Sequence, residues 1–218
     1  MRNKNEAGFT IIELMIAAAV FSTVLLIVSY GVIQVGRAFY KGSTMSATQE
    51  TTRTIIEDIS QAIQFSGDTV TTTIVSSGPG GIIKGFCVGD RQYSYVLNKQ
   101  LTDGTPGTEQ ARHVMMVDNV LGCNGTTAAK DIFAANPAGR ELVGINMRLS
   151  KLDIQCARNA AGACVPGLFN ITVGVASGDY NALRDSDGDG IKDTCDGGAS
   201  NQFCATSRLT TTVRQRVQ

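Results

Sequence analysis

Apolar residues are concentrated in one long run near the start of the chain. From residue 14 to residue 36, 23 consecutive positions carry no charge. A helix of that length can cross a hydrocarbon core of roughly 30 Å. Arg2 and Lys4 precede the run, which favours keeping that end in the cytoplasm. A secretory signal peptide fits poorly, because its apolar part is usually about 7–15 residues long and its small-residue cleavage site comes afterwards. Here Ala7-Gly8 precedes the run, so the pattern predicts one membrane-spanning helix.

A second helical pattern follows a polar interval. Ile55, Ile59, Ala62 and Ile63 are spaced i, i+4, i+7 and i+8, which places them on one face of an amphipathic helix. No proline occurs between residues 9 and 65, so one nearly continuous helix is expected, with residues 9–36 in the membrane and 37–65 as an amphipathic continuation. The stripe is too short for a convincing coiled coil, and we expect it to dock onto the chain's own sheet.

Residues 66–218 have the pattern of a mainly β, extracytoplasmic domain. Ser66-Gly67-Asp68 predicts the end of the helix. Alternating or β-branched runs separated by turn residues predict strands at Thr69–Val75, Ile82–Val88, Gln92–Leu97, His113–Val120 and Val143–Leu149, and around Ile171, Val173, Val175, Leu209, Val213 and Val217. The simplest architecture is an α+β fold in which the helix covers one face of an antiparallel sheet.

The segment before the apolar run carries a family resemblance. Gly8-Phe9-Thr10-Ile11-Ile12-Glu13-Leu14-Met15 resembles the cleavage and methylation motif of type IV prepilins and of type II secretion pseudopilins. The resemblance implies that residues 1–8 are a leader, that a prepilin peptidase cuts between Gly8 and Phe9, and that the new amino terminus of Phe9 is methylated. It also implies a type IV pilin-like fold with other pilin subunits and an inner-membrane assembly machinery as partners.

Glu13 is a charged residue at the edge of an apolar helix. A carboxylate there costs about 2.5–3.5 kcal/mol on insertion scales, so it normally faces a partner. The alternative is that Glu13 only reaches the headgroup layer. The resemblance implies a role in filament assembly, in which this glutamate pairs with the amino terminus of a neighbouring subunit.

Six cysteines suit an oxidising compartment, and none of them forms a CxxC pair. The absence of that spacing disfavours a zinc or thioredoxin-like site. Six cysteines allow 15 pairings. Short loops favour Cys156–Cys164 and Cys195–Cys204, which leaves Cys87–Cys123, while free buried thiols remain the alternative.

An acidic loop at residues 185–196 predicts a structural calcium site. Its carboxylates, at offsets 1, 3, 5, 9 and 12, repel one another unless a hard cation lies between them, and Gly190 at offset 6 permits a sharp turn. The candidate Ca2+ ligands are Asp185, Asp187, Asp189, Asp193 and Asp196. The loop lacks the final glutamate of an EF-hand and more closely resembles thrombospondin type 3 repeats. A solvated acidic turn without an ion is the alternative.

Composition mainly excludes classes of function. Lys plus Arg and Asp plus Glu both number 19, so no global positive field attracts nucleic acid. His113 is the only histidine, and no catalytic arrangement can be built around it, so no enzyme is expected.

The resemblance to type IV prepilins therefore implies a subunit of a type IV pilus-like filament. Such a subunit is held in the bacterial inner membrane by a single pass, with its C-terminal domain outside the cytoplasm, and then moves into a pilus or pseudopilus. Length and the 54–64 segment resemble the larger minor pilins of the W type or minor pseudopilins of the J type, and we favour a minor pilin. The alternatives are a type II secretion minor pseudopilin and, from another class, a single-pass, calcium-stabilised surface adhesin.

Overall fold

The computed structural model describes residues 8–66, 70–78, 81–123, 132–133, 138–197 and 203–216, and the expected leader residues 1–7 lie outside these ranges. The chain divides into two units, Met1–Tyr40 and Lys41–Gln218. The first unit is helical wherever it is described beyond Thr10. The second contains the sheets and the core, so each unit is described by itself.

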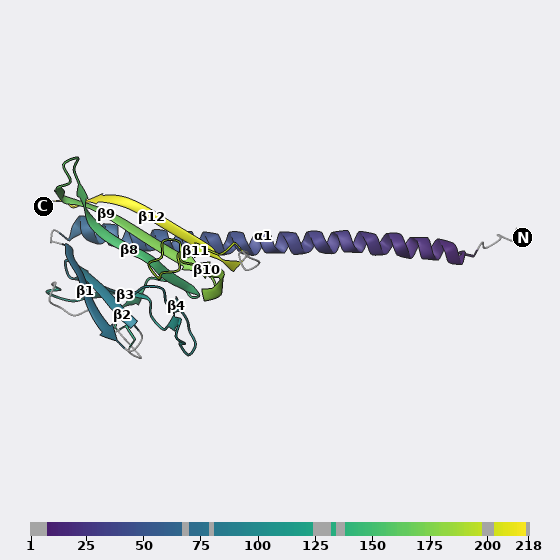
Figure 1. The fold of residues 1–218 in the computed structure, drawn as a ribbon, viewed down its shortest axis with the longest axis horizontal. Helices are drawn as coiled ribbons and strands as arrows, with labels where there is room; N and C mark the ends of the chain where they lie inside the picture. Colours follow the sequence, from purple (N-terminus) through teal and green to yellow (C-terminus); the bar gives the residue numbers. More distant parts are fainter. Residues whose placement is uncertain are drawn as a thin grey trace, which may run out of the picture. The chain divides into compact units, whose positions relative to one another are not determined.

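Helix α1 spans Ile11–Phe65, which confirms the expectation of one uninterrupted helix (Figure 1). In the described part of the chain it is the one helix long and apolar enough to cross a membrane. No residue of α1 is buried before Thr48. Large apolar side chains such as Ile12, Leu26 and Val35 lie exposed throughout the first unit. This segment therefore needs lipid or another protein to cover it.

Within the second unit, α1 forms part of the core. Ile55, Ile59 and Ile63 are fully buried, as the amphipathic stripe predicted. Thr48 and Thr52 are also buried, and each hydroxyl donates to the backbone carbonyl four residues earlier at 2.8 Å. The polar atoms of these threonines are therefore satisfied inside the helix. The helix docks onto the chain's own sheets.

Two five-stranded sheets make up most of the second unit. The first is fully antiparallel, with the order β1 (Val70–Gly78), β2 (Gly81–Val88), β3 (Arg91–Val96), β6 (Met115–Asn119) and β7 (Arg140–Glu141). The second has the order β12 (Ala205–Arg214), β9 (Cys164–Ser177), β8 (Met147–Arg158), β4 (Gln100–Leu101) and β5 (Gln110–Ala111), and only β4 and β5 are parallel. A two-stranded sheet, β10 (Leu183–Arg184) with β11 (Thr194–Cys195), follows the 3-10 helix η1 (Tyr180–Ala182).

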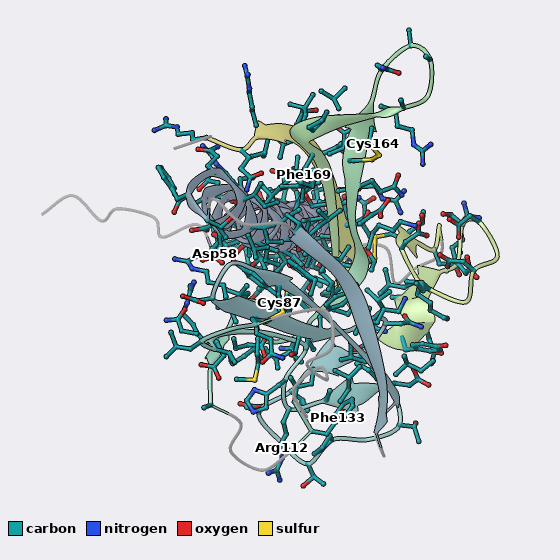
Figure 2. The ribbon with its side chains drawn as sticks, turned by 90° about the vertical axis from the view of Figure 1, so that its left-hand side faces the viewer. Asp58, Cys87, Arg112, Phe133, Cys164 and Phe169 are labelled. Atoms are coloured by element: carbon teal, nitrogen blue, oxygen red, sulfur yellow. A yellow bond between two sulfur atoms is a disulfide. The ribbon has the colours of Figure 1, made fainter. Side chains whose placement is uncertain are left out.

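The expected single sheet is thus replaced by two sheets that share α1. One hydrophobic cluster joins Ile59 of the helix to Tyr93 and Phe86 of the first sheet and to Val173 and Leu149 of the second. Figure 2 looks along the helix and shows sheet strands on more than one side of it. The α+β class is as predicted. The number of sheets was not predicted, because the pattern of a single strand does not specify which other strand it pairs with.

One predicted strand was placed too early. The alternation at Val143–Leu149 suggested a strand, but β8 begins at Met147. A turn precedes it, closed by the bond from the Met147 N–H to the Gly144 carbonyl at 3.1 Å, with Asn146 at φ 62°. Asparagine tolerates this left-handed conformation better than most residues. The other strand predictions overlap observed strands; Thr69 and Val217 lie outside the described residues.

Three disulfides join Cys87 to Cys123, Cys156 to Cys164, and Cys195 to Cys204. The last two are the pairs that short loops favoured, the first is the pair left over, and none of the six cysteines is free. The second bridge joins the two strands of the β8–β9 hairpin at its turn end. The third joins the end of β11 to the residue before β12, and its Cys195 lies within the 185–196 acidic loop.

Candidate functional site

The expected processing site lies in an open segment before α1. Phe9 is 85% exposed, and a Cβ added at Gly8 would meet no atom within 4 Å. A peptide bond that a protease must bind in extended form has to be accessible. Gly8 and Phe9, which form the expected cleavage bond, are both exposed and meet that requirement. The rest of the leader lies outside the described residues.

Glu13 closes the first turn of α1. One of its carboxylate oxygens accepts the backbone N–H of Thr10 at 3.0 Å and the hydroxyl of Thr10 at 2.7 Å. The N–H of Glu13 lies 3.4 Å from that hydroxyl. This is a capping box, in which the N-cap residue before the helix and the third helical residue satisfy each other's backbone groups. Within a single chain, Glu13 therefore has a local partner at the end of the apolar helix.

Polar side chains inside the apolar run are also satisfied locally. The Ser22 hydroxyl donates to the Ala18 carbonyl and the Thr23 hydroxyl to the Val20 carbonyl, both at 2.8 Å. Such bonds reduce the cost of placing a hydroxyl in hydrocarbon. This part of α1 can therefore lie in lipid without a polar partner.

The acidic loop brings three of its five candidate ligands together. One carboxylate oxygen from each of Asp185, Asp187 and Asp189 can be chosen so that all three lie within 4.8 Å of one another. Oxygen donors at that spacing are suited to a hard cation such as Ca2+. The loop thus provides a partial oxygen cage, made from alternate residues of a tight turn.

Backbone conformation produces this cage. Gly188 and Gly190 have φ of 80° and 82°, which glycine adopts without strain. The turn directs the N–H groups of Gly188 and Gly190 at the two carboxylate oxygens of Asp185, each at 2.7 Å. These bonds, the one from Gly190 above all, hold the pKa of Asp185 below its usual value. Asp185 is therefore kept ionised at the base of the loop.

The remaining two candidate ligands are placed differently. Asp193 accepts hydrogen bonds from the Ser186 hydroxyl at 2.8 Å and from the Arg208 guanidinium at 2.9 Å. Burial opposes its ionisation, but these bonds and one from Thr194 outweigh burial and lower the pKa of Asp193. Asp196 is exposed, and its N–H donates to the Ala182 carbonyl at 2.8 Å. Neither belongs to the three-carboxylate cluster.

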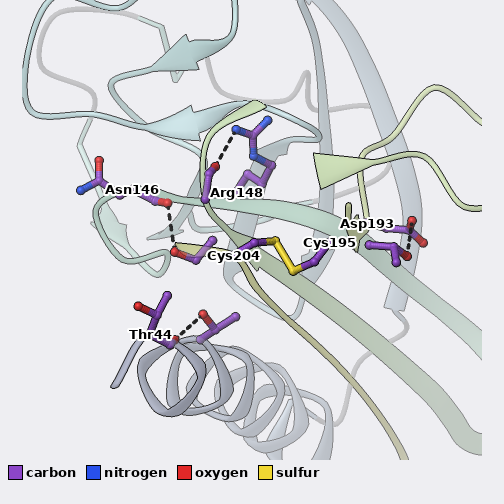
Figure 3. Close-up of a disulfide and its surroundings, with 10 residues drawn as sticks. Thr44, Asn146, Arg148, Asp193, Cys195 and Cys204 are labelled. Carbon is purple, nitrogen blue, oxygen red and sulfur yellow. Dashed lines mark hydrogen bonds between the residues drawn. A yellow bond between two sulfur atoms is a disulfide. The ribbon is translucent and has the colours of Figure 1, made fainter. Parts of the chain in front are cut away.

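Residues from distant segments brace the loop, and sequence analysis did not identify them. Asn98 donates to the Gly190 carbonyl at 3.0 Å and accepts the Lys192 N–H at 3.2 Å. The Lys192 ammonium lies 3.9 Å from the centre of the Tyr180 ring. Figure 3 shows Asp193 and the Cys195–Cys204 bridge in this region. Asn98 has a left-handed backbone conformation, which asparagine tolerates better than most residues. An asparagine directly after a predicted strand was the only sequence signal that pointed to it.

A second polar cluster, also missed, fastens α1 to the first sheet. Asp58 accepts the Tyr93 hydroxyl at 2.8 Å and the Arg140 guanidinium at 2.7 Å, and Arg91 lies 3.7 Å away. Burial and the Asp58 charge raise the pKa of Tyr93. The cluster thus ties the helix to β3 and β7 through one buried hydrogen bond and two ion pairs.

His113 also has a structural environment. Its Nδ1 lies 3.5 Å from Glu141, whose carboxylate accepts the N–H groups of Val114, Met115 and Val143. The carboxylate of Glu141 is thereby hydrogen-bonded to three backbone N–H groups. The group of described residues that could hold a metal ion lies in the acidic loop and does not include His113.

Fold and site together define a class of protein: an α+β domain, closed by disulfides, whose N-terminal helix continues into an exposed apolar segment of membrane-spanning length. Residues 3–29 match the family model described as the prokaryotic N-terminal methylation motif, which is the hallmark of type IV prepilin-like proteins. No curated protein matches the chain. No solved structure matches it either. The motif supports a pilin-like or pseudopilin precursor, and it implies processing by a prepilin peptidase and assembly with other pilins.

Proposed function

We propose that this chain is a minor pilin of a type IV pilus-like filament. Prepilin peptidase cleaves it between Gly8 and Phe9 and methylates Phe9, and the subunit then waits in the inner membrane through residues 9–36. Polymerisation transfers the same helix from lipid into the filament core, and the second unit remains outside the cytoplasm. The role we favour is priming or capping of the filament rather than building its bulk.

One observation carries the proposal: the methylation motif at residues 3–29 opens a helix whose first 30 residues bury none of their apolar side chains. A soluble domain does not expose such a surface. Lipid covers it before assembly and neighbouring helices cover it afterwards, which matches the two locations of a pilin. A type II secretion pseudopilin uses the same motif and remains the second candidate.

Glu13 is the residue we assign to assembly. Its carboxylate is already aligned by Thr10 at the helix start, so the amine of a neighbouring Phe9 can replace or join that contact. Glu13→Lys reverses the charge and is expected to abolish incorporation into filaments while leaving the chain in the membrane. Glu13→Gln keeps an acceptor for the cap and serves as the charge control. Full incorporation of both variants would remove Glu13 from the assembly step.

Mass spectrometry of sheared filaments and of membranes from the native cells tests the function. A peptide that begins at methylated Phe9 in filaments supports a pilin, and its low abundance relative to other subunits supports a minor one. A processed form in membranes alone favours a pseudopilin. An intact leader in every fraction would refute the proposal and favour a membrane-anchored adhesin.

We also propose that the 185–196 loop holds a structural Ca2+ through Asp185, Asp187 and Asp189. The spacing of these carboxylates and their oxygen chemistry support the assignment. Asp193 and Asp196 were expected to complete the set, and for Asp193 this requires release from Arg208. The bound ion would offset part of the negative charge of the loop and fix its turn beside the Cys195–Cys204 bridge.

Calcium binding is tested by melting the purified chain with Ca2+ and with a chelator. At 100 times the dissociation constant, an ion that binds only the folded state adds about 2.7 kcal/mol. Chelation should therefore lower Tm by several degrees, and Asp187→Asn should reduce that difference. Asp103→Asn, at an exposed position outside the loop, is the matched control. An unchanged Tm on chelation would refute the site.

A further inference from the structure

Three large apolar side chains lie exposed at the end of the second unit where the chain enters it. Met45 on α1, Ile145 in the turn before β8 and Phe203 just before β12 are 46%, 57% and 59% exposed. We call these three side chains the entry rim. Single apolar side chains scattered over a surface need no explanation, but a group of them at one place indicates a contact surface.

Strand register places two members of the entry rim at one end of the second sheet. β8 begins, β9 ends and β12 begins at the same level, because Met147 and Ala205 both pair with Ser177. Ile145 and Phe203 each lie two residues before one of these strands. Both side chains therefore project from loops at the same end of the sheet.

The helix contributes the third member at the same level. Ser46 and Thr206 line one groove, so Met45, the residue before Ser46, lies close to the start of β12. Figure 3 draws the sequence neighbour of each rim residue in the surroundings of one disulfide, and these neighbours are Thr44, Asn146 and Cys204. The entry rim is therefore one surface beside the part of α1 that first joins the core.

The length of the chain holds this end of the unit close to a bilayer. The uncharged run ends at Gly36, and the second unit begins at Lys41. These five steps cover about 7.5 Å as a helix and at most about 18 Å when fully extended. The headgroup layer on one side of a bilayer is itself about 5–7.5 Å thick. With residues 9–36 in the membrane, the entry end therefore lies at the lipid surface on either path.

We propose that the entry rim inserts Met45, Ile145 and Phe203 into the lipid surface from which α1 emerges. Apolar side chains that dock in this way reach about 5–10 Å into the boundary between headgroups and acyl chains. Lys41 and Asp179 are both exposed near the rim and carry opposite charges. Apolar contact, rather than attraction to anionic lipid, therefore drives the docking.

The contact fixes how the second unit lies over the bilayer before assembly, and it is lost when the subunit leaves the membrane for a filament. The inference rests on the membrane-spanning part of the proposed function and does not depend on filament assembly. It applies to a chain that is only anchored in the membrane as well.

Tryptophan fluorescence tests the contact, because the chain contains no tryptophan and a single introduced one reports its own surroundings. Full-length Phe203→Trp is reconstituted in phosphatidylcholine nanodiscs whose acyl chains carry bromine near the headgroup end. Bromine quenches tryptophan only at short range. Emission should shift to shorter wavelength and fall about twofold or more relative to nanodiscs without bromine, as expected for a side chain about 5–10 Å deep. Adding anionic phosphatidylglycerol should leave the quenching unchanged.

Leu121→Trp is the matched control. Leu121 is 91% exposed and lies at the opposite end of the unit. The N–H of the preceding residue, Val120, donates to the Asp90 carbonyl at 2.7 Å, and Asp90 lines a pocket with the last turn of α1. The emission of Leu121→Trp should therefore be the same with and without bromine.

A second reporter tests whether the rim acts as one surface. Ile145→Trp should be quenched like Phe203→Trp, and adding Phe203→Ser to Ile145→Trp should lower that quenching. All of these positions are exposed, so the variants should keep the Tm of the unchanged chain. A loss of quenching at equal Tm then reports the lipid contact and not the fold.

The outcomes separate this inference from the proposed function. Quenching of Phe203→Trp no greater than that of Leu121→Trp would overturn the lipid contact and leave the pilin assignment standing. An emission shift that requires other proteins of the native membrane would also overturn it, because the rim would then bind a protein. Quenching of Phe203→Trp together with an intact leader in every cell fraction would support the contact and refute the pilin assignment.

Discussion

Asp58→Ala is a direct test of how α1 is fastened to the first sheet. The change removes the acceptor of the Tyr93 hydroxyl and the charge that Arg140 and Arg91 share. Tyr93 is fully buried, so its hydroxyl would lose its partner in a place that water does not reach easily. The expected result is a less stable domain in which the helix still forms.

The structure sets the magnitude. A hydrogen bond to a charged group contributes about 1.5–3 kcal/mol. The Arg140 side chain is 61% exposed, and Arg91 is 44% exposed at 3.7 Å, so each ion pair adds no more than about 0.2–1 kcal/mol. We expect a loss of about 3 kcal/mol for Asp58→Ala. For a domain of this size that loss lowers Tm by roughly 6–12 °C.

Thermal and urea unfolding of a chain that starts at Lys41 measures the effect, with circular dichroism as the signal. Asp58→Asn retains an acceptor for Tyr93 and should cost only about 1 kcal/mol, the share of the arginines. A double-mutant cycle with Tyr93→Phe should return a coupling above about 0.5 kcal/mol. Equal losses for Asp58→Ala and Asp58→Asn, or a coupling near zero, would show that the Tyr93 bond does not stabilise the domain.

Three further predictions concern the core of the same unit. Ile59→Ala leaves a cavity at a fully buried position and should cost about 2–5 kcal/mol in urea unfolding, against less than 1 kcal/mol for an exposed control such as Thr54→Ala. Burial and the charge of Asp153 raise the pKa of Tyr95 to about 12. The folded chain therefore keeps a proton that the unfolded chain releases near pH 10, so stability should fall as pH rises from about 10 to 12, and tyrosinate absorbance should appear together with unfolding. Ionisation of Tyr95 in a fully folded chain below pH 10 would contradict this. Gly174→Ala would bring a Cβ to 2.7 Å from the Ser150 hydroxyl oxygen, so Tm should drop, and an unchanged Tm would mean that β8 shifts freely.

Local patterns predicted the elements that depend on local chemistry. The uncharged run and the spacing of Ile55, Ile59 and Ile63 were sufficient for the helix and its buried face. The two short disulfide loops were predicted because eight or nine residues bring their cysteines close together on almost any path. The motif around Gly8 and Phe9 was visible because its residues are consecutive.

Features that depend on contacts between distant segments were not predictable. The separation of the strands into two sheets depends on which runs pair across many residues. Asn98 reaches the acidic loop from 92 positions away, and Tyr93 reaches Asp58 from 35. The displacement of Asp193 from the expected ligand set has the same origin, since its partner Arg208 belongs to a strand that follows the loop. Sequence spacing indicated candidate ligands but not the side chains that compete for them.

The position of the first buried residue of α1, Thr48, has a consequence for reuse of the protein. Everything that stabilises the core lies within Lys41–Gln218, and the apolar segment before it contributes no buried side chain. Moving that segment between lipid and a fibre therefore exchanges one apolar environment for another, and the domain need not unfold. Under the proposed function, the subunit keeps its core intact through such a transfer and is therefore reusable.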